Sequence, residues 1–178
     1  MNQKERLKLE LRSARKFSES LFESFKTTEH WMHQVEPRAY HPLWIAGHVG
    51  LAENFSIQLL DPRRSFERPL FREKFAVGTR PTSDLADYPS LDEILEYMRE
   101  RRATLLDILE SLDDEDLDEP APPGSPRFIP DVGSVFCGAA WHEAMHSGQV
   151  NVVYRALEEV PVGYKAPVWT GPSPVRGV

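Results

Sequence analysis

Two histidines four positions apart, His142 and His146, are the residues with the clearest capacity for chemistry. Residues four apart on an α-helix lie one above the other, about 6 Å apart, so both imidazoles can reach one ion. The pair belongs to an apolar stripe with alternating steps of four and three residues, as on the buried face of a helix: Val135, Ala139, His142, His146, Gln149, Val153 and Ala156. Two imidazoles in such a setting would each need a polar partner, and a metal ion satisfies both.

A third histidine, His48, lies on another apolar stripe with Ile45, Ala52 and Leu59. A single inward histidine is more often a hydrogen-bonded core residue than a ligand. His48 is therefore a candidate ligand only because His142 and His146 are also present. Three neutral nitrogens with open positions match a catalytic zinc-type site, and nickel or ferrous iron would also fit. We therefore predict one divalent ion in the interior of a helix bundle, with three ligands: His48, His142 and His146.

Residues 142–146 also match the pattern His-Glu-x-x-His, in which two histidines bind zinc and the glutamate is the general base of a metalloprotease. The extended form of this motif requires a glycine and a further histidine at positions that are Gln149 and Val152 here. The short form requires only a later carboxylate, but no convincing edge strand lies upstream to hold a peptide. A zinc hydrolase is therefore the alternative, with Glu143 as its general base. Glu143 could instead be an exposed acid or assist proton transfer, because a position next to a ligand does not by itself direct it at the metal.

Gln149 follows His146 by one turn and is the second catalytic candidate after Glu143, because its amide could orient a bound water or an imidazole. It could equally pair with the backbone in the core. Cys137 is the one cysteine and lies on a different helical face from His142, so we expect a buried, inert thiol. The other histidines lie in an irregular link and are expected to be exposed or to cap a helix: His30, His33 and His41.

Four long helical patterns must position these residues. The first covers residues 4–25, and the second begins at Pro42, which is favoured at a first helical position, and ends before Pro62. The third opens with a capping box at residues 90–93 and continues to about residue 112. The fourth begins near residues 131–134 and continues to about Glu159.

The connections between these helices differ in character. Residues 61–89 form a long crossover without a sustained period, which is unusual unless the segment covers something. Residues 113–130 are acidic and proline-rich, which predicts a solvated loop. Arg102 is the one charged residue in the stripe of the third helix, and we expect its head to reach water. The chain thus predicts an all-α four-helix bundle over residues 1–160 and a proline-rich tail over 161–178.

Composition narrows the class of protein. The 178 residues suffice for one domain, and the net charge of −7 without a basic stripe disfavours nucleic acid and anionic membranes. No run of about 18 apolar residues predicts a membrane-spanning helix. The N-terminal sequence lacks the apolar segment of a signal peptide, so we expect a cytoplasmic protein that acts on a small molecule.

Two segments carry a family resemblance. Pro-Leu-Trp-Ile-Ala-Gly-His at 42–48 and His-Glu-Ala-Met-His-Ser-Gly-Gln at 142–149 resemble the signatures of the DinB/YfiT-like proteins, over roughly residues 5–160. The resemblance implies a four-helix bundle with a long crossover, frequent homodimers and a metal site at His48, His142 and His146. Characterised relatives include mycothiol-dependent maleylpyruvate isomerase and bacillithiol S-transferases, which implies a low-molecular-weight thiol as a possible cofactor.

The leading functional hypothesis is therefore a metal-dependent enzyme of the thiol S-transferase or isomerase type, in which the ion favours the nucleophilic thiolate. Two alternatives compete with it. One is the zinc hydrolase, and the other is a non-enzymatic dimeric bundle in which the ion is structural. Removal of the metal distinguishes a structural ion from an ion in an open site. The binding free energy of a structural ion contributes to folding, so the protein should unfold when that ion is removed.

Overall fold

The structure of the protein is a computed structural model that describes residues 1–157. Four long helices pack side by side, and no strand occurs among the residues described. These helices are α1 (Gln3–Phe22), α3 (Pro42–Leu60), α5 (Leu91–Ser111) and α6 (Val132–Leu157). The all-α prediction is confirmed. The predicted tail at 161–178 and the last residues of the predicted fourth helix lie outside the described part.

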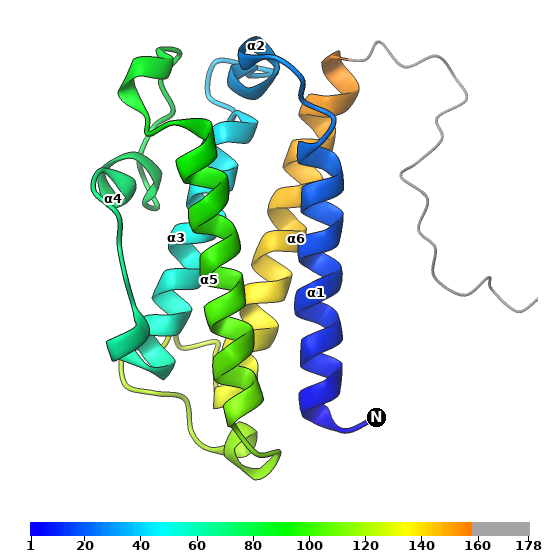
Figure 1. Cartoon of the computed structure of the whole chain (residues 1–178), viewed down its shortest axis with the longest axis vertical. Coiled ribbons are helices and arrows are strands. Elements are labelled where there is room, and N and C mark those ends of the chain that lie inside the picture. The colour runs from blue at the N-terminus through cyan, green and yellow to red at the C-terminus, as the bar shows by residue number, and fades with distance from the viewer. Residues whose placement is uncertain (158–178) are drawn as a thin grey trace, which may run out of the picture.

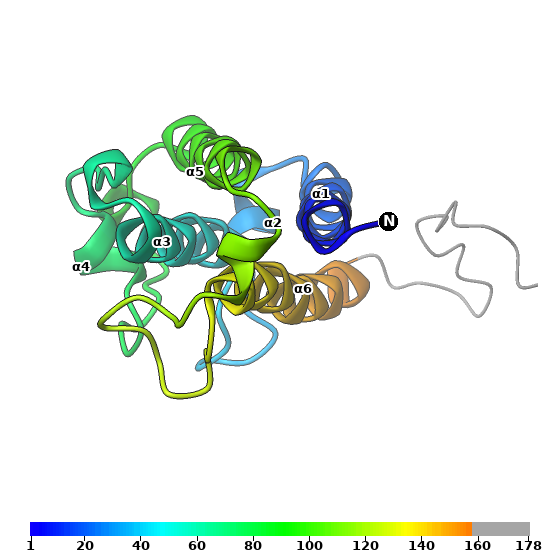
Figure 2. The same ribbon diagram turned by 90° about the horizontal axis from the view of Figure 1, so that it is seen from below.

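The end view shows α1 beside α6 and α3 beside α5, with α3 also against α6 (Figure 2). Along the bundle, α3 and α5 run in the same direction, and α1 and α6 run opposite to them (Figure 1). Neighbouring parallel helices cannot be joined by a short turn. The crossover at 61–90 therefore has to return along the length of the bundle, which explains its length.

The helix starts confirm the local signals in the sequence. Pro42 is the first residue of α3, and the N-cap is His41, whose Nδ1 accepts a hydrogen bond from the Trp44 N–H at 3.0 Å. At the start of α5, Ser90 and Glu93 form the reciprocal capping box. Such caps satisfy N–H groups that have no partner within the helix.

The crossover packs against α3. It contains two 3₁₀ turns, η1 (Pro62–Arg64) and η2 (Leu85–Asp87), and the short helix α4 (Phe71–Phe75). The Phe75 side chain is fully buried, and a Cβ atom at Gly47 would lie 2.6 Å from its ring carbons. Only a glycine in α3 therefore allows the crossover to approach this closely.

The apolar core is divided into two clusters. One includes Trp44 and Phe75 and extends towards α2 (Thr28–Met32), which covers that end of the bundle. The other includes Leu11 and Phe136 and extends to Leu117 in the 3₁₀ turn η3 (Glu115–Asp118). The predicted solvated loop at 113–130 is thus wrong at one point, because Leu117 is fully buried.

Two further expectations about burial are wrong. Arg102 does not reach water but is only 4% exposed, because Glu53 and Glu143 pair with its guanidinium inside the bundle. Cys137 is exposed, since it lies on the outer face of α6. None of the helices within residues 1–157 combines the length and the hydropathy that a membrane-spanning segment requires.

The burial and hydrogen bonds of His41 lead us to predict that the stability of the folded protein depends on pH. It is fully buried, its Nε2 donates to the Thr82 carbonyl at 3.2 Å, and its Nδ1 must stay unprotonated to cap α3. Burial lowers the pKa of His41 to about 4, below the ordinary 6.5. The unfolded chain therefore binds the proton first, and this stabilisation is complete above pH 6.5 and is lost as the pH falls towards 4.

We expect the free energy of unfolding of the metal-free protein to fall below pH 6.5, with His41 contributing at most about 1.4 kcal/mol per pH unit. Urea unfolding at pH 7, 6 and 5 measures this fall. His41→Asn keeps a capping side chain but removes the titrating group, so its slope should be smaller. An equal slope in both proteins would exclude His41 as a source of the pH dependence.

Candidate metal site

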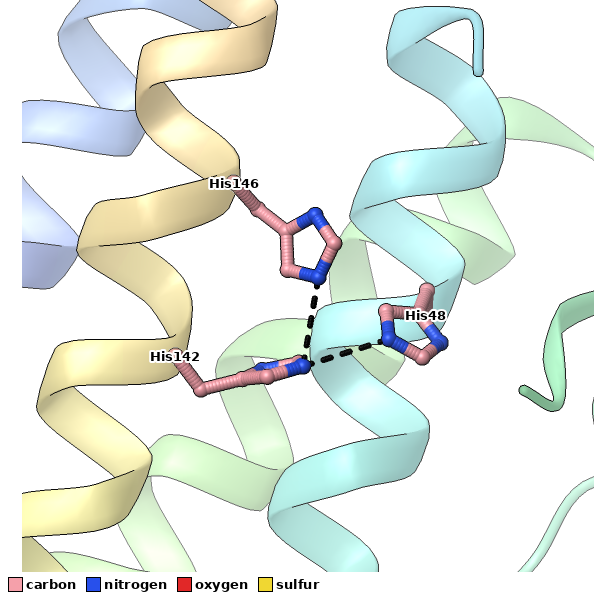
Figure 3. Close-up of side chains that lie close together, drawn as sticks. All are labelled: His48, His142 and His146. Carbon is pink, nitrogen blue, oxygen red and sulfur yellow. Dashed lines mark hydrogen bonds between the residues drawn. The ribbon is translucent and has the colours of Figure 1, made fainter. Parts of the chain in front are cut away.

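The three predicted histidines come together between α3 and α6 (Figure 3). His48 projects from α3, and His142 and His146 project from successive turns of α6. The Nε2 of His142 lies 3.2 Å from the Nε2 of His48 and 3.2 Å from that of His146. All three ligand atoms lie within 4.8 Å of one another.

The outer nitrogens of two rings are already occupied. His48 Nδ1 donates to the Phe75 carbonyl at 2.7 Å, and His146 Nδ1 donates to the Gln149 amide oxygen at 2.8 Å. In a neutral imidazole the proton on Nδ1 leaves a lone pair on Nε2. Both lone pairs are therefore directed at the cluster, as in metal sites whose histidines are held by outer hydrogen bonds.

Hydrogen bonding alone cannot satisfy this arrangement. His142 Nε2 faces the Nε2 lone pairs of His48 and His146, and one proton on it could serve only one of them. A zinc–nitrogen bond of about 2.0–2.1 Å at tetrahedral angles separates two ligand nitrogens by roughly 3.3 Å. The observed 3.2 Å separations match that value, so the three side chains fit a divalent ion.

The electrostatics favour the ligand form. Burial lowers the pKa of each of the three histidines below 6.5. For His142 the pKa falls to about 3, because the neighbouring His146 and His48 add to the effect of burial. All three imidazoles are therefore neutral at pH 7, which is the state that binds metal.

Aromatic stacking holds His48 from the other side. The Trp44 indole lies parallel to the His48 ring with centroids 4.6 Å apart, and Tyr40 stacks on Trp44 at 3.8 Å. The indole Nε1–H of Trp44 donates to the Lys74 carbonyl at 2.8 Å. The crossover thus fixes His48 both directly through Phe75 and through Trp44.

The two catalytic candidates, Gln149 and Glu143, occupy different places. Gln149 contacts the cluster through His146. Glu143 does not, because one of its carboxylate oxygens accepts hydrogen bonds from Arg15 and Ser18 and the other from Arg102. The histidines lie where α3 and α6 meet, with His48 and His146 buried and His142 partly exposed.

Comparison with known proteins identifies a family. A family model described as the DinB superfamily matches residues 10–150, which includes all three histidines and more than half of the chain. No curated protein matches the sequence, and no solved structure matches it.

Proposed function

Because the chain belongs to the DinB superfamily, we propose that the three converging histidines form a functional site for one divalent metal ion. The observation that carries this proposal is the pair of outer hydrogen bonds that direct the Nε2 lone pairs of His48 and His146 at His142. Zinc, nickel and ferrous iron all accept three imidazoles.

The proposed activity is that of a metal-dependent thiol S-transferase or isomerase acting on a small molecule, with a low-molecular-weight thiol as cofactor. A bound divalent ion lowers the pKa of a coordinated thiol and so supplies the thiolate nucleophile. The chain contributes three neutral ligands, which leave the positive charge of the ion uncompensated. Partial exposure of His142 leaves a side from which a substrate can approach.

The test is thiol alkylation at pH 7. Metal-loaded protein should accelerate the reaction of cysteine-derived thiols with a chromogenic aryl halide, through a thiolate fraction raised by up to about 30-fold from that of a free thiol. Metal-free protein and His142→Ala should not accelerate it. If the loaded protein retains its metal and activates no thiol in the panel, the transferase and isomerase assignment is wrong.

The hydrolase alternative is disfavoured by the position of Glu143. A general base must reach a water molecule at the metal, but both oxygens of this carboxylate are engaged by arginines away from the histidines. A chelation experiment distinguishes a purely structural ion from an ion in an open site. An apo protein that stays folded favours the open site, and one that unfolds favours the structural ion.

We further propose a homodimer, as the family resemblance implies. The outer face of α6 supports it, because Trp141 and Met145 are large apolar side chains that are 61% and 43% exposed. Light scattering at micromolar concentrations should give twice the mass of one chain, and Trp141→Glu should shift the population towards the monomer. A wild-type monomer across this range excludes the dimer.

A further inference from the structure

Four charged side chains form a closed ring in the middle of the bundle, with one residue from each long helix. Arg15 of α1 donates from Nε to Glu143 at 2.7 Å and from Nη2 to Glu53 at 2.8 Å. Arg102 of α5 donates from Nε to Glu53 at 2.5 Å and from Nη2 to Glu143 at 2.5 Å. The ring carries no net charge, and all four side chains are buried.

The ring is tied to the backbone as well. Arg15 Nη1 donates to the Met98 carbonyl of α5 at 2.7 Å, and Arg102 Nη1 donates to the Leu11 carbonyl of α1. Ser18 of α1 donates its hydroxyl to Glu143 at 2.5 Å. Each guanidinium group therefore bonds a main-chain carbonyl of a neighbouring helix in addition to the two carboxylates.

Stability alone does not explain this ring. Removing four charges from water carries a large penalty, and replacing a buried ion group by apolar residues of similar volume is often neutral or stabilising. Contacts between apolar side chains do not depend strongly on the relative orientation of the helices, whereas hydrogen bonds between charged groups do. Planar guanidinium groups bond carboxylates in a narrow geometry, so the ring forms only when the helices have one axial position and one rotation.

The connectivity of the ring points to the histidines. Both glutamates come from the helices that carry the histidines, Glu53 from α3 and Glu143 from α6. Both arginines come from the other two helices, and each of them bonds both glutamates. Each arginine is thus a bridge between α3 and α6.

The rotation of α6 follows from the same contacts. Successive residues of an α-helix are turned by about 100°, so a Glu143 that faces the ring places His142 about 100° and His146 about 60° round the helix on one side. That side faces His48 on α3. If α6 turned or slid, the ring and the convergence of the three histidines would be lost together.

We propose that Arg15 and Arg102 are positioning residues that lock α3 to α6 through Glu53 and Glu143 and thereby preset the histidines for a metal ion. This inference rests on the proposed metal site. It assigns the ring a role in metal affinity that is separate from its effect on folding.

The experiment replaces the ring by apolar residues, in the variant Arg15→Met/Glu53→Leu/Arg102→Met/Glu143→Leu. Its unfolding midpoint without metal should be unchanged or higher, whereas its Zn²⁺ affinity, measured by competition with a chromophoric chelator, should fall by about 10–100-fold. The absorption spectrum of the Co²⁺ form should change, because it reports ligand geometry. If the folded variant binds Zn²⁺ as tightly as the wild type and gives the same Co²⁺ spectrum, the proposal is overturned.

A second variant tests the proposal if the first variant does not fold. Arg15→Lys/Arg102→Lys keeps the charges but removes the fork that spans two carboxylates, so a smaller fall in Zn²⁺ affinity is expected, and an unchanged affinity overturns the proposal. The control is Leu109→Ala in the core cluster away from the ring. It should lower stability while leaving the Zn²⁺ affinity within about twofold, as expected for an independent site.

A wild-type protein that binds neither Zn²⁺ nor Co²⁺ would refute the metal site without deciding the role of the ring. The imidazole ¹⁵N resonances of the metal-free proteins then decide it. A ring that positions the histidines predicts shifted resonances for His48, His142 and His146 in the apolar variant, and identical resonances overturn that role.

Discussion

Alanine at any one of the three clustered histidines, His48, His142 or His146, is expected to leave the purified protein nearly free of metal. Loss of an outer partner of a ligand already costs about 10–100-fold in affinity, and loss of a ligand should cost more. Because each ring supplies one of only three nitrogens, the two that remain cannot hold the ion through dialysis. Wild-type protein should carry close to one ion per chain.

The measurement is elemental analysis of untagged protein purified without chelator. His33→Ala is the matched control, since it removes a histidine outside the cluster and should keep its metal. Gln149→Ala should be intermediate, because it frees the Nδ1 of His146 without removing a ligand. The metal site would be refuted if every protein, wild type included, were folded and metal-free even after addition of zinc, nickel or iron. The histidines would then be core residues.

The fold and the convergence of the three histidines could be predicted because their signals are local. A capping box, a proline at a first helical position and a spacing of four residues act within one turn or two of a helix. His142 and His146 share a face for that reason alone. His48 could be added because an inward face on one helix of a small bundle must meet inward faces of the others.

The groups that hold these three histidines in place give weaker signals in the sequence. The partner of His48 Nδ1 is a backbone carbonyl, that of Phe75, and any residue type supplies such a carbonyl. It lies in a crossover without periodicity, so no pattern indicated it. The stacking of Trp44 on His48 has a stronger signal in the sequence, because Trp44 precedes His48 by four residues in the same helix.

The ionic ring was missed because its partners are distant in sequence. Arg15 is 38 residues from Glu53 and 128 from Glu143, and no spacing rule connects charges so far apart. Arg102 was visible as an interruption of an apolar stripe, but a single helix gives no means of distinguishing a buried partner from water. The His-Glu-x-x-His motif suggests proton transfer for Glu143, although successive residues of a helix point in different directions, so that Glu143 faces away from His142 and His146.

Glu143→Ala is expected to lower the free energy of unfolding by about 3–5 kcal/mol, the typical result of removing one partner from a buried ion group. Glu143 is 1% exposed, and its loss leaves Arg15 and Arg102 buried with only Glu53 between them. Burial acts to raise the pKa of Glu143, but the two arginines outweigh burial and hold that pKa below 4.5. Its contribution is therefore present above pH 4.5 and is lost as the pH falls through the lowered pKa.

Urea unfolding of metal-free protein at pH 7 measures this loss. The matched control is Glu110→Ala, which removes a carboxylate that is 62% exposed and pairs with Lys8 at the surface. Such exposed pairs contribute about 0–1 kcal/mol, so the two glutamate variants should differ by several-fold. Equal, small losses would mean that the ring does not form as the structure has it.

The same measurement separates the general base that the His-Glu-x-x-His motif suggests from the ring member that the structure shows. A general base at a metal is expendable for folding, so its alanine variant would abolish hydrolysis and leave stability nearly unchanged. A member of a closed ionic ring behaves in the opposite way, because its absence strands two guanidinium groups in the interior. A large loss of stability would therefore place Glu143 among the residues that hold α6 in position. It would also argue against the hydrolase activity that the His-Glu-x-x-His motif suggests.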